Sequence, residues 1–205
     1  LARKNSRVVG FVGAGVQAMT QLEALAHVFE IEEAKVNDIS IERSEKFARE
    51  MGKKVGIKIK VERDTKTAVE GADIVITTTP SRKPIVFDRW ISPGVHINAI
   101  GADAPGKQEL DPKILKRAKV VVDDIQQAIH SGEVNVPLST GEIARGDIYG
   151  DLGEIVTGKK PGRTSNDEIT LFDSTGLAVQ DIATDWVVYK KALKMKVGRK
   201  IDLFS

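Results

Sequence analysis

Apolar residues along the chain fall into short runs that alternate with stretches of helical spacing. Residues 7–12, RVVGFV, are β-branched and aromatic residues bounded by turn formers, as is typical of a buried strand. In the next stretch, residues 16–30, apolar side chains recur at Leu22, Leu25 and Phe29, which is the spacing of one helix face. The chain is therefore predicted to open with a strand followed by a helix.

The same alternation continues to residue 122. Further strands are predicted at residues 34–38, 57–61, 73–78, 95–100 and 119–122. Helices are predicted at residues 42–51, 66–70 and 112–117, and Gly52 is predicted to end the first of them. Because strands that alternate with helices form parallel sheets with both faces covered, the pattern predicts a doubly wound α/β fold.

The pattern changes in the last third of the chain. Residues 124–172 combine helix and loop signals with scattered glycines and end in a last strand, EITLFD. From Gly176 onward, large apolar residues such as Trp186 and Tyr189 recur at helical spacing. We therefore expect a sheet domain over residues 1–172 and, over residues 173–205, a helical segment that buries its apolar face outside that domain.

The sequence GAGVQA lies between the first predicted strand and the first predicted helix. Gly13 permits a tight turn, Gly15 leaves the backbone open to a pyrophosphate, and Ala18 lets the helix lie close to the strand. The free N–H groups and the positive dipole end of the helix then face a phosphate. This is the dinucleotide-binding pattern of a Rossmann fold; the alternative is a glycine turn that only packs the helix on the strand.

Asp38 falls 20 residues after Ala18, at the end of the second predicted strand. A carboxylate at this place accepts hydrogen bonds from the adenosine ribose hydroxyls and repels a 2′-phosphate. No Arg follows Asp38 directly, so the sequence favours NAD over NADP. The alternative is an ordinary exposed carboxylate at the end of a strand.

Three polar stretches occur at the ends of other predicted strands: TTTPSRKP, INAIGADAPGKQEL and FDSTGLAVQD. Ligands of open α/β sheets collect at the carboxyl ends of the strands. Near the cofactor we therefore expect Thr78, Thr79, Asn98, Gly101, Asp103 and Lys107. Hydroxyl and N–H groups at the start of a helix come from Ser174, Thr175 and Gly176.

GAGVQA, TTTPSRKP, INAIGADAPGKQELD and DSTGLAVQD together resemble the ornithine cyclodeaminase/mu-crystallin family, over essentially the whole chain. The fuller wording PSRKP and HINAIGADAPGKQEL is most similar to the archaeal branch that includes NAD-dependent alanine dehydrogenases. The resemblance implies a homodimer of two-domain subunits, with a first half that precedes this chain and carries much of the substrate pocket. It also implies that the C-terminal helix returns to that first domain.

The resemblance further implies roles for individual residues. Cofactor contacts are implied for Gly13, Gly15, Val16, Gln17, Asp38, Thr78, Thr79, Ile100, Gly101, Ala102, Asp103, Lys107 and Ser174. Thr175 is implied to lie near the substrate, and Asp103 matches the catalytic aspartate of the family. The Arg and Lys that hold the substrate carboxylate belong to the missing half.

The activity that the resemblance implies is hydride transfer from the α-carbon of a small L-amino acid to NAD, as in L-alanine dehydrogenase. Two alternatives stay open: an ornithine cyclodeaminase, or a non-catalytic binder of NAD(P) or a small ligand. Asp103 would act as a general base near the α-carbon, and we expect it to be buried beside the nicotinamide. The alternative is a loop carboxylate that caps a helix near Lys107.

Composition restricts the partners and the compartment. With 31 Lys and Arg against 29 Asp and Glu, the net charge of +2 gives no reason to expect a nucleic acid or an anionic membrane as partner. No apolar run approaches the roughly 20 residues of a spanning helix. The lack of cysteine excludes disulfides and thiolate metal sites, and the three histidines have no ligand spacing, so we expect no metal. We expect a cytoplasmic protein of which this chain, starting at Leu1 without a leader, is a fragment or processed product.

Overall fold

The computed structural model describes residues 1–199 and 201. The chain divides into two compact units, residues 1–175 and residues 176–205. The first unit contains the sheet and the glycine turn, and the second contains one long helix.

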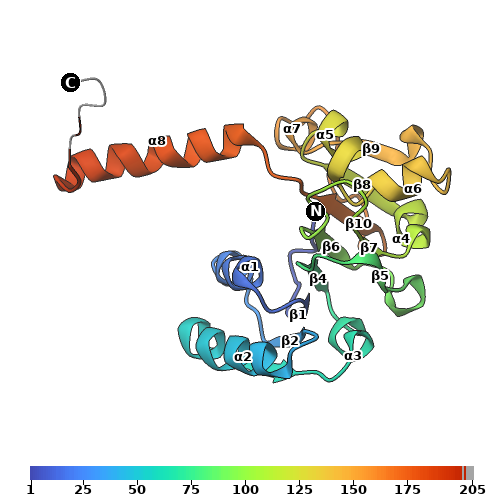
Figure 1. The fold of residues 1–205 in the computed structure, drawn as a ribbon, viewed down its shortest axis with the longest axis horizontal. Coiled ribbons are helices and arrows are strands. Elements are labelled where there is room, and N and C mark those ends of the chain that lie inside the picture. The colour runs from blue at the N-terminus through green and yellow to red at the C-terminus, as the bar shows by residue number, and fades with distance from the viewer. Residues whose placement is uncertain (200, 202–205) are drawn as a thin grey trace. The chain divides into compact units, whose positions relative to one another are not determined.

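The first unit is built on a single sheet of eight parallel strands (Figure 1). The spatial order is β3-β2-β1-β4-β6-β10-β8-β9. The strands span Val8–Val12 (β1), Glu33–Asn37 (β2), Lys58–Val61 (β3), Ile74–Thr77 (β4), His96–Ala99 (β6), Ala118–Val122 (β8), Ile148–Asp151 (β9) and Ile169–Asp173 (β10). The predicted doubly wound α/β fold is confirmed, and its strand order reverses direction between β1 and β4.

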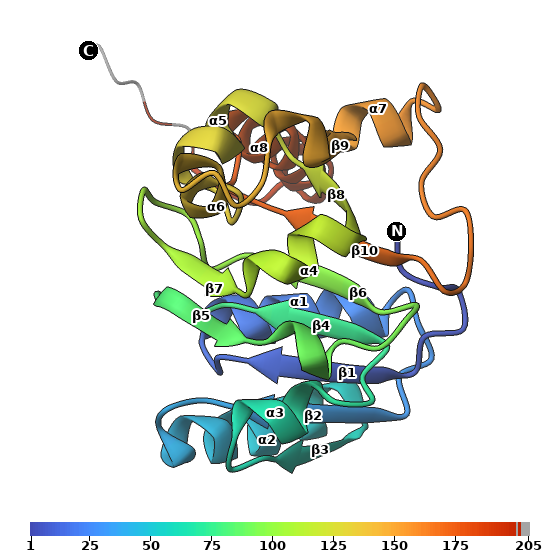
Figure 2. The ribbon, with the colours of Figure 1, turned by 90° about the vertical axis from the view of Figure 1, so that its right-hand side faces the viewer.

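Helices cover both faces of this sheet. Figure 2 shows α3 and α4 in front of the strands and α1 behind them. The helices of the first unit span Val16–Ala26 (α1), Ile41–Val55 (α2), Thr65–Val69 (α3), Pro112–Arg117 (α4), Ile125–Ser131 (α5), Asn135–Ser139 (α6) and Leu152–Val156 (α7). Short 3-10 turns occur at Asp88–Trp90 (η1) and Arg145–Asp147 (η2).

Alternating residues of β1 supply the two hydrophobic cores. Val9 and Phe11 pack with Leu22 of α1 and Phe47 of α2, and the rings of Phe11 and Phe47 lie 5.2 Å apart. Val12 belongs to the other core, on the side of α3 and α4. Because both faces of the strand are buried, the sequence of β1 is continuously apolar, which is why it was recognisable as a strand.

Two predicted helix ends differ from the structure. α2 does not stop at Gly52 but continues to Val55, and Gly56 ends it with a left-handed φ of 76°. α1 ends at Ala26 rather than at residue 30, because the chain turns there to enter β2. In both places the helical pattern was correct and only the position of its end was wrong.

Three strands were not predicted from the sequence. Arg82–Val86 (β5) and Gln108–Leu110 (β7) pair with each other in a separate two-stranded sheet, and β9 is an edge strand of the large sheet. β5 carries two exposed cations and a proline, and β7 has only three residues, so neither has the apolar alternation of a buried strand.

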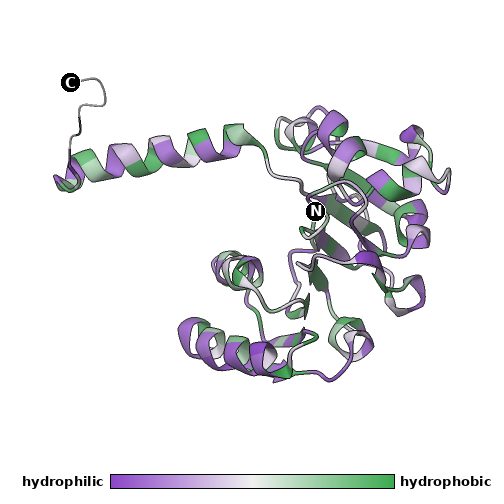
Figure 3. Ribbon diagram, in the orientation of Figure 1, coloured by the Kyte–Doolittle hydropathy of each residue, from purple (hydrophilic) through white to green (hydrophobic). Residues whose placement is uncertain are grey.

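The second unit is the helix α8, Ala178–Met195. Its apolar side chains are exposed, and these are Val179, Ile182, Trp186, Val187, Val188, Tyr189, Leu193 and Met195. Figure 3 shows apolar and polar residues alternating along the helix. Among the described residues, no helix has the length and apolar composition required to cross a membrane.

Candidate functional site

A hollow of about 350 Å³ opens where β1 and β4 end, at the point where the strand order reverses. We call it the crevice, and its lining is Val12, Gly13, Gly15, Asn37, Asp38, Ile39, Arg43, Thr65, Thr78, Thr79, Pro80, Ser81 and Ile85. Five of the predicted cofactor residues are in this set: Gly13, Gly15, Asp38, Thr78 and Thr79. This is the place in an open α/β sheet where a ligand is expected.

The glycine turn forms the floor of the crevice. Gly13 has a φ of +100°, and a Cβ there would lie 2.7 Å from Oγ1 of Thr78, so a side chain is excluded twice over. A Cβ on Gly15 would meet nothing within 4 Å. Gly15 is also the N-cap of α1 and offers no side-chain cap to the first N–H groups of that helix. The turn therefore presents open backbone and helix N–H groups to the crevice, as binding a phosphate requires.

Asp38 follows β2 directly and braces the glycine turn. Its Oδ2 accepts a hydrogen bond from the N–H of Ala14 at 3.0 Å, and its Oδ1 accepts one from the N–H of Ser40 at 2.9 Å. The side chain is only 10% exposed. Nε of Arg43, in the first turn of α2, lies 3.4 Å from Oδ1, so a cation does approach Asp38 although none follows it directly in the sequence.

Two loops at the carboxyl edge of the sheet are tied together by one buried side chain. The N–H of Thr79, after β4, donates to Oε1 of Glu109 at 2.6 Å. The N–H of Gly101, after β6, donates to Oε2 of the same carboxylate at 3.0 Å. Both loops carry predicted cofactor residues, so Glu109 fixes the spacing of the segments on which those residues lie.

A profile of the ornithine cyclodeaminase/mu-crystallin family matches residues 1–196. The chain belongs to this family. It is 52% identical to alanine dehydrogenase of Archaeoglobus fulgidus over the whole of this chain and 62% of the relative. It is 38% identical to a Delta(1)-pyrroline-2-carboxylate reductase of Bacillus cereus, over 98% of this chain and 62% of the relative.

Solved structures of the family have the same fold. An archaeal alanine dehydrogenase dimer with bound NAD matches with a TM-score of 0.94 and 52% identity, over all of this chain and 63% of that one. Thermococcus litoralis Delta(1)-pyrroline-2-carboxylate reductase, in complex with NADH and L-proline, matches with a TM-score of 0.95 and 44% identity, over 98% of this chain and 62% of that one. The chain thus spans a little under two thirds of the length of these family members.

Asp103, for which the sequence analysis expects a catalytic role, is exposed in this chain. Its side chain is 58% exposed and makes an ion pair with Lys107, whose side chain is 20% exposed. The side chain is therefore exposed in this chain, and its expected burial beside the nicotinamide stays a prediction for the full-length protein with bound cofactor. Lys107 lies beside it, but β7 and not a helix follows Lys107, so Asp103 does not cap a helix as the alternative interpretation expected.

The other predicted contacts surround the crevice without lining it. Ile100 continues β6, its N–H donating to the carbonyl of Thr77 at 2.9 Å, and Ala102 is buried. Val16 and Gln17 are exposed at the start of α1. These residues lie at the same carboxyl edge of the sheet as the crevice, on the elements that the sequence predicted.

Ser174 and Thr175 follow β10 at this edge. The N–H of Ser174 donates to the carbonyl of Ala99 at 3.0 Å. The N–H of Thr175 donates to Oδ2 of Asp123 at 2.7 Å, and its hydroxyl lies 2.8 Å from Oδ1 of the same carboxylate. The predicted substrate residue is thus held in place by an acidic residue that the sequence analysis did not single out.

Sequence analysis also missed three fully buried carboxylates, Glu109, Glu133 and Asp173. Glu133 accepts hydrogen bonds from the N–H groups of Glu109 and Leu110, the latter at 2.7 Å. Asp173 accepts them from the N–H groups of Glu133 and Val134, at 2.9 and 3.2 Å. We call these three residues the carboxylate ladder. The only signal in the sequence is an acidic residue inside an otherwise apolar segment, such as LFD at the end of β10.

Burial controls the protonation of the ladder. It raises the pKa of Glu109, and it raises the pKa of Glu133 well above the usual range, with the nearby charge of Glu109 adding to the effect. Burial likewise raises the pKa of Asp173 to about 7. The ladder therefore holds protons at pH values where exposed carboxylates have lost them.

His96 at the start of β6 is a buried core residue. Its two ring nitrogens lie 2.9 Å from Oγ1 of Thr170 and 2.9 Å from Oδ1 of Asn98. Burial lowers its pKa to about 3, so the ring stays neutral. Asn98, which was expected near the cofactor, is instead turned to this histidine.

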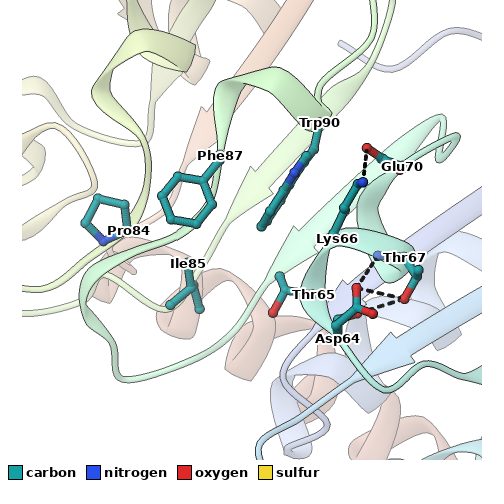
Figure 4. Close-up of a pocket in the computed structure, with 9 residues that line it drawn as sticks. All are labelled: Asp64, Thr65, Lys66, Thr67, Glu70, Pro84, Ile85, Phe87 and Trp90. Atoms are coloured by element: carbon teal, nitrogen blue, oxygen red, sulfur yellow. Dashed lines mark hydrogen bonds and ion pairs between the residues drawn. The ribbon is translucent and has the colours of Figure 1, made fainter.

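A second, more open hollow of about 610 Å³ lies beside the crevice (Figure 4). Its walls are α3 on one side and the segment with Ile85, Phe87 and Trp90 on the other. The rings of Phe87 and Trp90 meet edge to face at 4.9 Å. Since Thr65 and Ile85 line both hollows, the second one continues the crevice outward over α3.

Proposed function

We propose that the crevice binds NAD and that the full-length protein is an NAD-dependent oxidoreductase acting on a small L-amino acid, namely an L-alanine dehydrogenase. The reaction is L-alanine, NAD and water to pyruvate, ammonia and NADH. The observation that carries the proposal is the open backbone at Gly15, beside Asp38 in the crevice. The 52% identity to an alanine dehydrogenase supports the choice of substrate within the family.

The described residues fit the cofactor. The N–H groups of Val16 and Gln17 at the start of α1 have no side-chain cap to compete with a pyrophosphate. Asp38 lies in the crevice, where it can accept hydrogen bonds from the ribose hydroxyls. Thr79 belongs to the adenine side, while residues 100–103, Lys107 and Ser174 belong to the nicotinamide side.

Bound NAD supplies the acceptor for a hydride from the α-carbon of the substrate. Asp103 then acts as the general base: it takes a proton from the water that adds to the iminium carbon and returns it to the departing ammonia. Lys107 pairs with Asp103 and holds its carboxylate in place for that step. Thr175, fixed by Asp123, lies at the substrate.

A second candidate is an imine reductase, because the reductase of Thermococcus litoralis is 44% identical to this chain over the part of it that matches. It uses the same step in the opposite direction, with a hydride added to a carbon–nitrogen double bond. Two further alternatives are an ornithine cyclodeaminase and a non-catalytic binder.

One assay separates these candidates. Full-length protein is mixed with NAD and L-alanine, then with NAD and L-ornithine, then with NADH and Δ1-pyrroline-2-carboxylate, and NADH absorbance is followed. NADH formed steadily from alanine supports the proposal. Proline and ammonia from ornithine without net NADH would identify a cyclodeaminase, and consumption of NADH by the cyclic imine alone would identify the reductase. Tight NAD binding without turnover of any of the three would identify a binder.

We further propose that residues 176–205, rather than the expected 173–205, belong to a second domain, and that the full-length protein is a homodimer. The support is the row of exposed apolar residues on α8, together with the length of the relatives beyond this chain. The lack of cysteine fits a reducing compartment such as the cytoplasm.

A further inference from the structure

The carboxylate ladder connects three parts of the first unit that are far apart in the sequence. Asp173, at the end of β10, holds the backbone of Glu133 between α5 and α6. Glu133 holds the backbone of Glu109 in β7, and Glu109 holds the N–H groups of Thr79 and Gly101. Each carboxylate accepts hydrogen bonds from two backbone N–H groups. The ladder thereby fixes the position of two loops at the crevice relative to the sheet.

Two glycines make room for the ladder. A Cβ on Gly101 would lie 2.5 Å from Oε2 of Glu109, and a Cβ on Gly132 would collide with Oδ2 of Asp173. Neither glycine has a positive φ, so backbone strain does not account for them. The close approach of the Thr79 backbone and of the Glu109 carboxylate accounts for Gly101, and that of the Asp173 carboxylate accounts for Gly132, so the backbone leaves no room for a side chain at either place beside the ladder.

Burying the three carboxylates of the ladder carries a desolvation penalty. None of the ion pairs among the described residues involves Glu109, Glu133 or Asp173. Carboxylates without a cation are stabilised by their hydrogen-bond donors or by protonation. Apolar side chains would fill the same space at lower cost, but they could not accept the N–H groups of Thr79 and Gly101.

We propose that Glu109 is a positioning residue for the cofactor: its carboxylate ties the loop after β4 to the loop after β6 and thereby sets the width of the dinucleotide site. The proposal rests on the proposed NAD binding. Glu109 acts through the backbone of Thr79 and Gly101 and does not contact the reacting atoms. Glu133 and Asp173 hold Glu109 in register.

The test is Glu109→Gln in the full-length protein. The amide keeps one acceptor oxygen but presents an NH2 group to the other backbone N–H, so one of the two loops loses its anchor. We expect the Kd for NADH, measured by fluorescence titration, to rise about tenfold. Hydrogen exchange resolved to single residues should accelerate at Thr79 or Gly101. The neighbouring amides of Thr78 and Ile100, which donate to strand carbonyls, should stay protected.

Glu168→Gln is the matched control. Glu168 also accepts a backbone N–H, that of Thr164 at 2.9 Å, and also lies near β10, but at the opposite end of that strand. This variant loses an ion pair with Lys119, so it should lower the unfolding temperature while the Kd for NADH stays within about twofold of the original. A merely structural role of Glu109 predicts the same behaviour for both variants.

The outcomes are distinct. If the original protein does not bind NADH, the proposed function fails before the role of Glu109 is reached. If Glu109→Gln folds and keeps both the original Kd and the protection of Thr79 and Gly101, the positioning role is overturned. If Glu109→Gln does not fold, the test is made on the original protein. Bound NADH is then expected to slow hydrogen exchange at the amides of Thr79 and Gly101, and unchanged exchange at both would refute the positioning role of Glu109.

Discussion

Gly13 and Gly15 stand two residues apart in one turn, yet a methyl group would act differently at each. At Gly13 the φ of +100° and the closeness of Thr78 would strain any side chain, whether or not a ligand is bound. We expect Gly13→Ala to lower the free energy of unfolding by about 1–3 kcal/mol, measured by chemical denaturation. An unchanged denaturation midpoint would show that the turn relaxes freely.

Gly15→Ala is the matched variant in the same turn. Gly15 has an extended backbone conformation, and its added methyl would project into open space, so unfolding should change by less than about 0.5 kcal/mol. The methyl would, however, occupy the place proposed for the pyrophosphate. We expect the Kd for NADH to rise about tenfold or more, and an unchanged Kd would argue against phosphate binding at this turn.

The residues that the sequence predicted well are those whose role is local. The glycine turn and Asp38 lie within one strand–helix–strand unit, so their spacing in the sequence determines where they lie relative to one another. The ladder cannot be predicted in this way, because its contacts join residues 24 and 40 positions apart through loops of irregular length. The exposure of Asp103 was not predictable either, since it depends on what packs above its loop.

At the scale of elements, the ladder makes stability depend on pH. Burial raises the pKa of Asp173 in β10 to about 7, whereas its unfolded value is about 3.9. The folded state therefore binds a proton more tightly than the unfolded state. The resulting stabilisation is fully present below about pH 4 and is lost as the pH rises toward about 7.

Comparing the original protein with Asp173→Asn isolates this effect, because the amide cannot ionise. Relative to the variant, the free energy of unfolding of the original protein should fall between about pH 4 and pH 7, by about 1.4 kcal/mol for each unit of pKa difference. The variant's own loss of a hydrogen bond shifts its curve by a constant. Because the charge of Asp173 also raises the pKa of Glu133, the slope difference reports the titration of Asp173 together with its effect on Glu133. Parallel curves for the two proteins would show that Asp173 is ionised throughout.

The elements that sequence reasoning missed share a physical reason. β5 and β9 are partly exposed, and β7 is buried but has only three residues, two of them polar, so none of the three strands has a continuous apolar run. The central strands β1, β4 and β8 are buried nearly throughout, and their apolar sequences located them correctly. The fold class can thus be predicted from the apolar sequences of the core strands, whereas the small sheet that carries Glu109 cannot.

At the scale of the whole molecule, the two units differ in how their apolar residues are covered. The strands of the first unit are buried by its own helices, but no residue of α8 is buried. Trp186 and Tyr189 stack on each other at 5.9 Å and remain more than half exposed. Such a concentration of exposed aromatic and aliphatic side chains is typical of a surface that another part of a protein covers.

Trp186 can test whether a second domain covers the apolar surface of α8, because the sequence has only one other tryptophan, Trp90. In a Trp90→Phe background, fluorescence reports Trp186 alone, which is 58% exposed in the 205-residue chain. We expect its emission to lie at shorter wavelength and acrylamide to quench it several-fold less in the full-length protein, because the second domain buries the indole. Trp90 in a Trp186→Phe background serves as the control, since it packs on Phe87 within the first unit and its emission should be the same in both proteins. If Trp186 is quenched equally in both proteins, α8 does not belong to a second domain, and its apolar face must meet a separate partner.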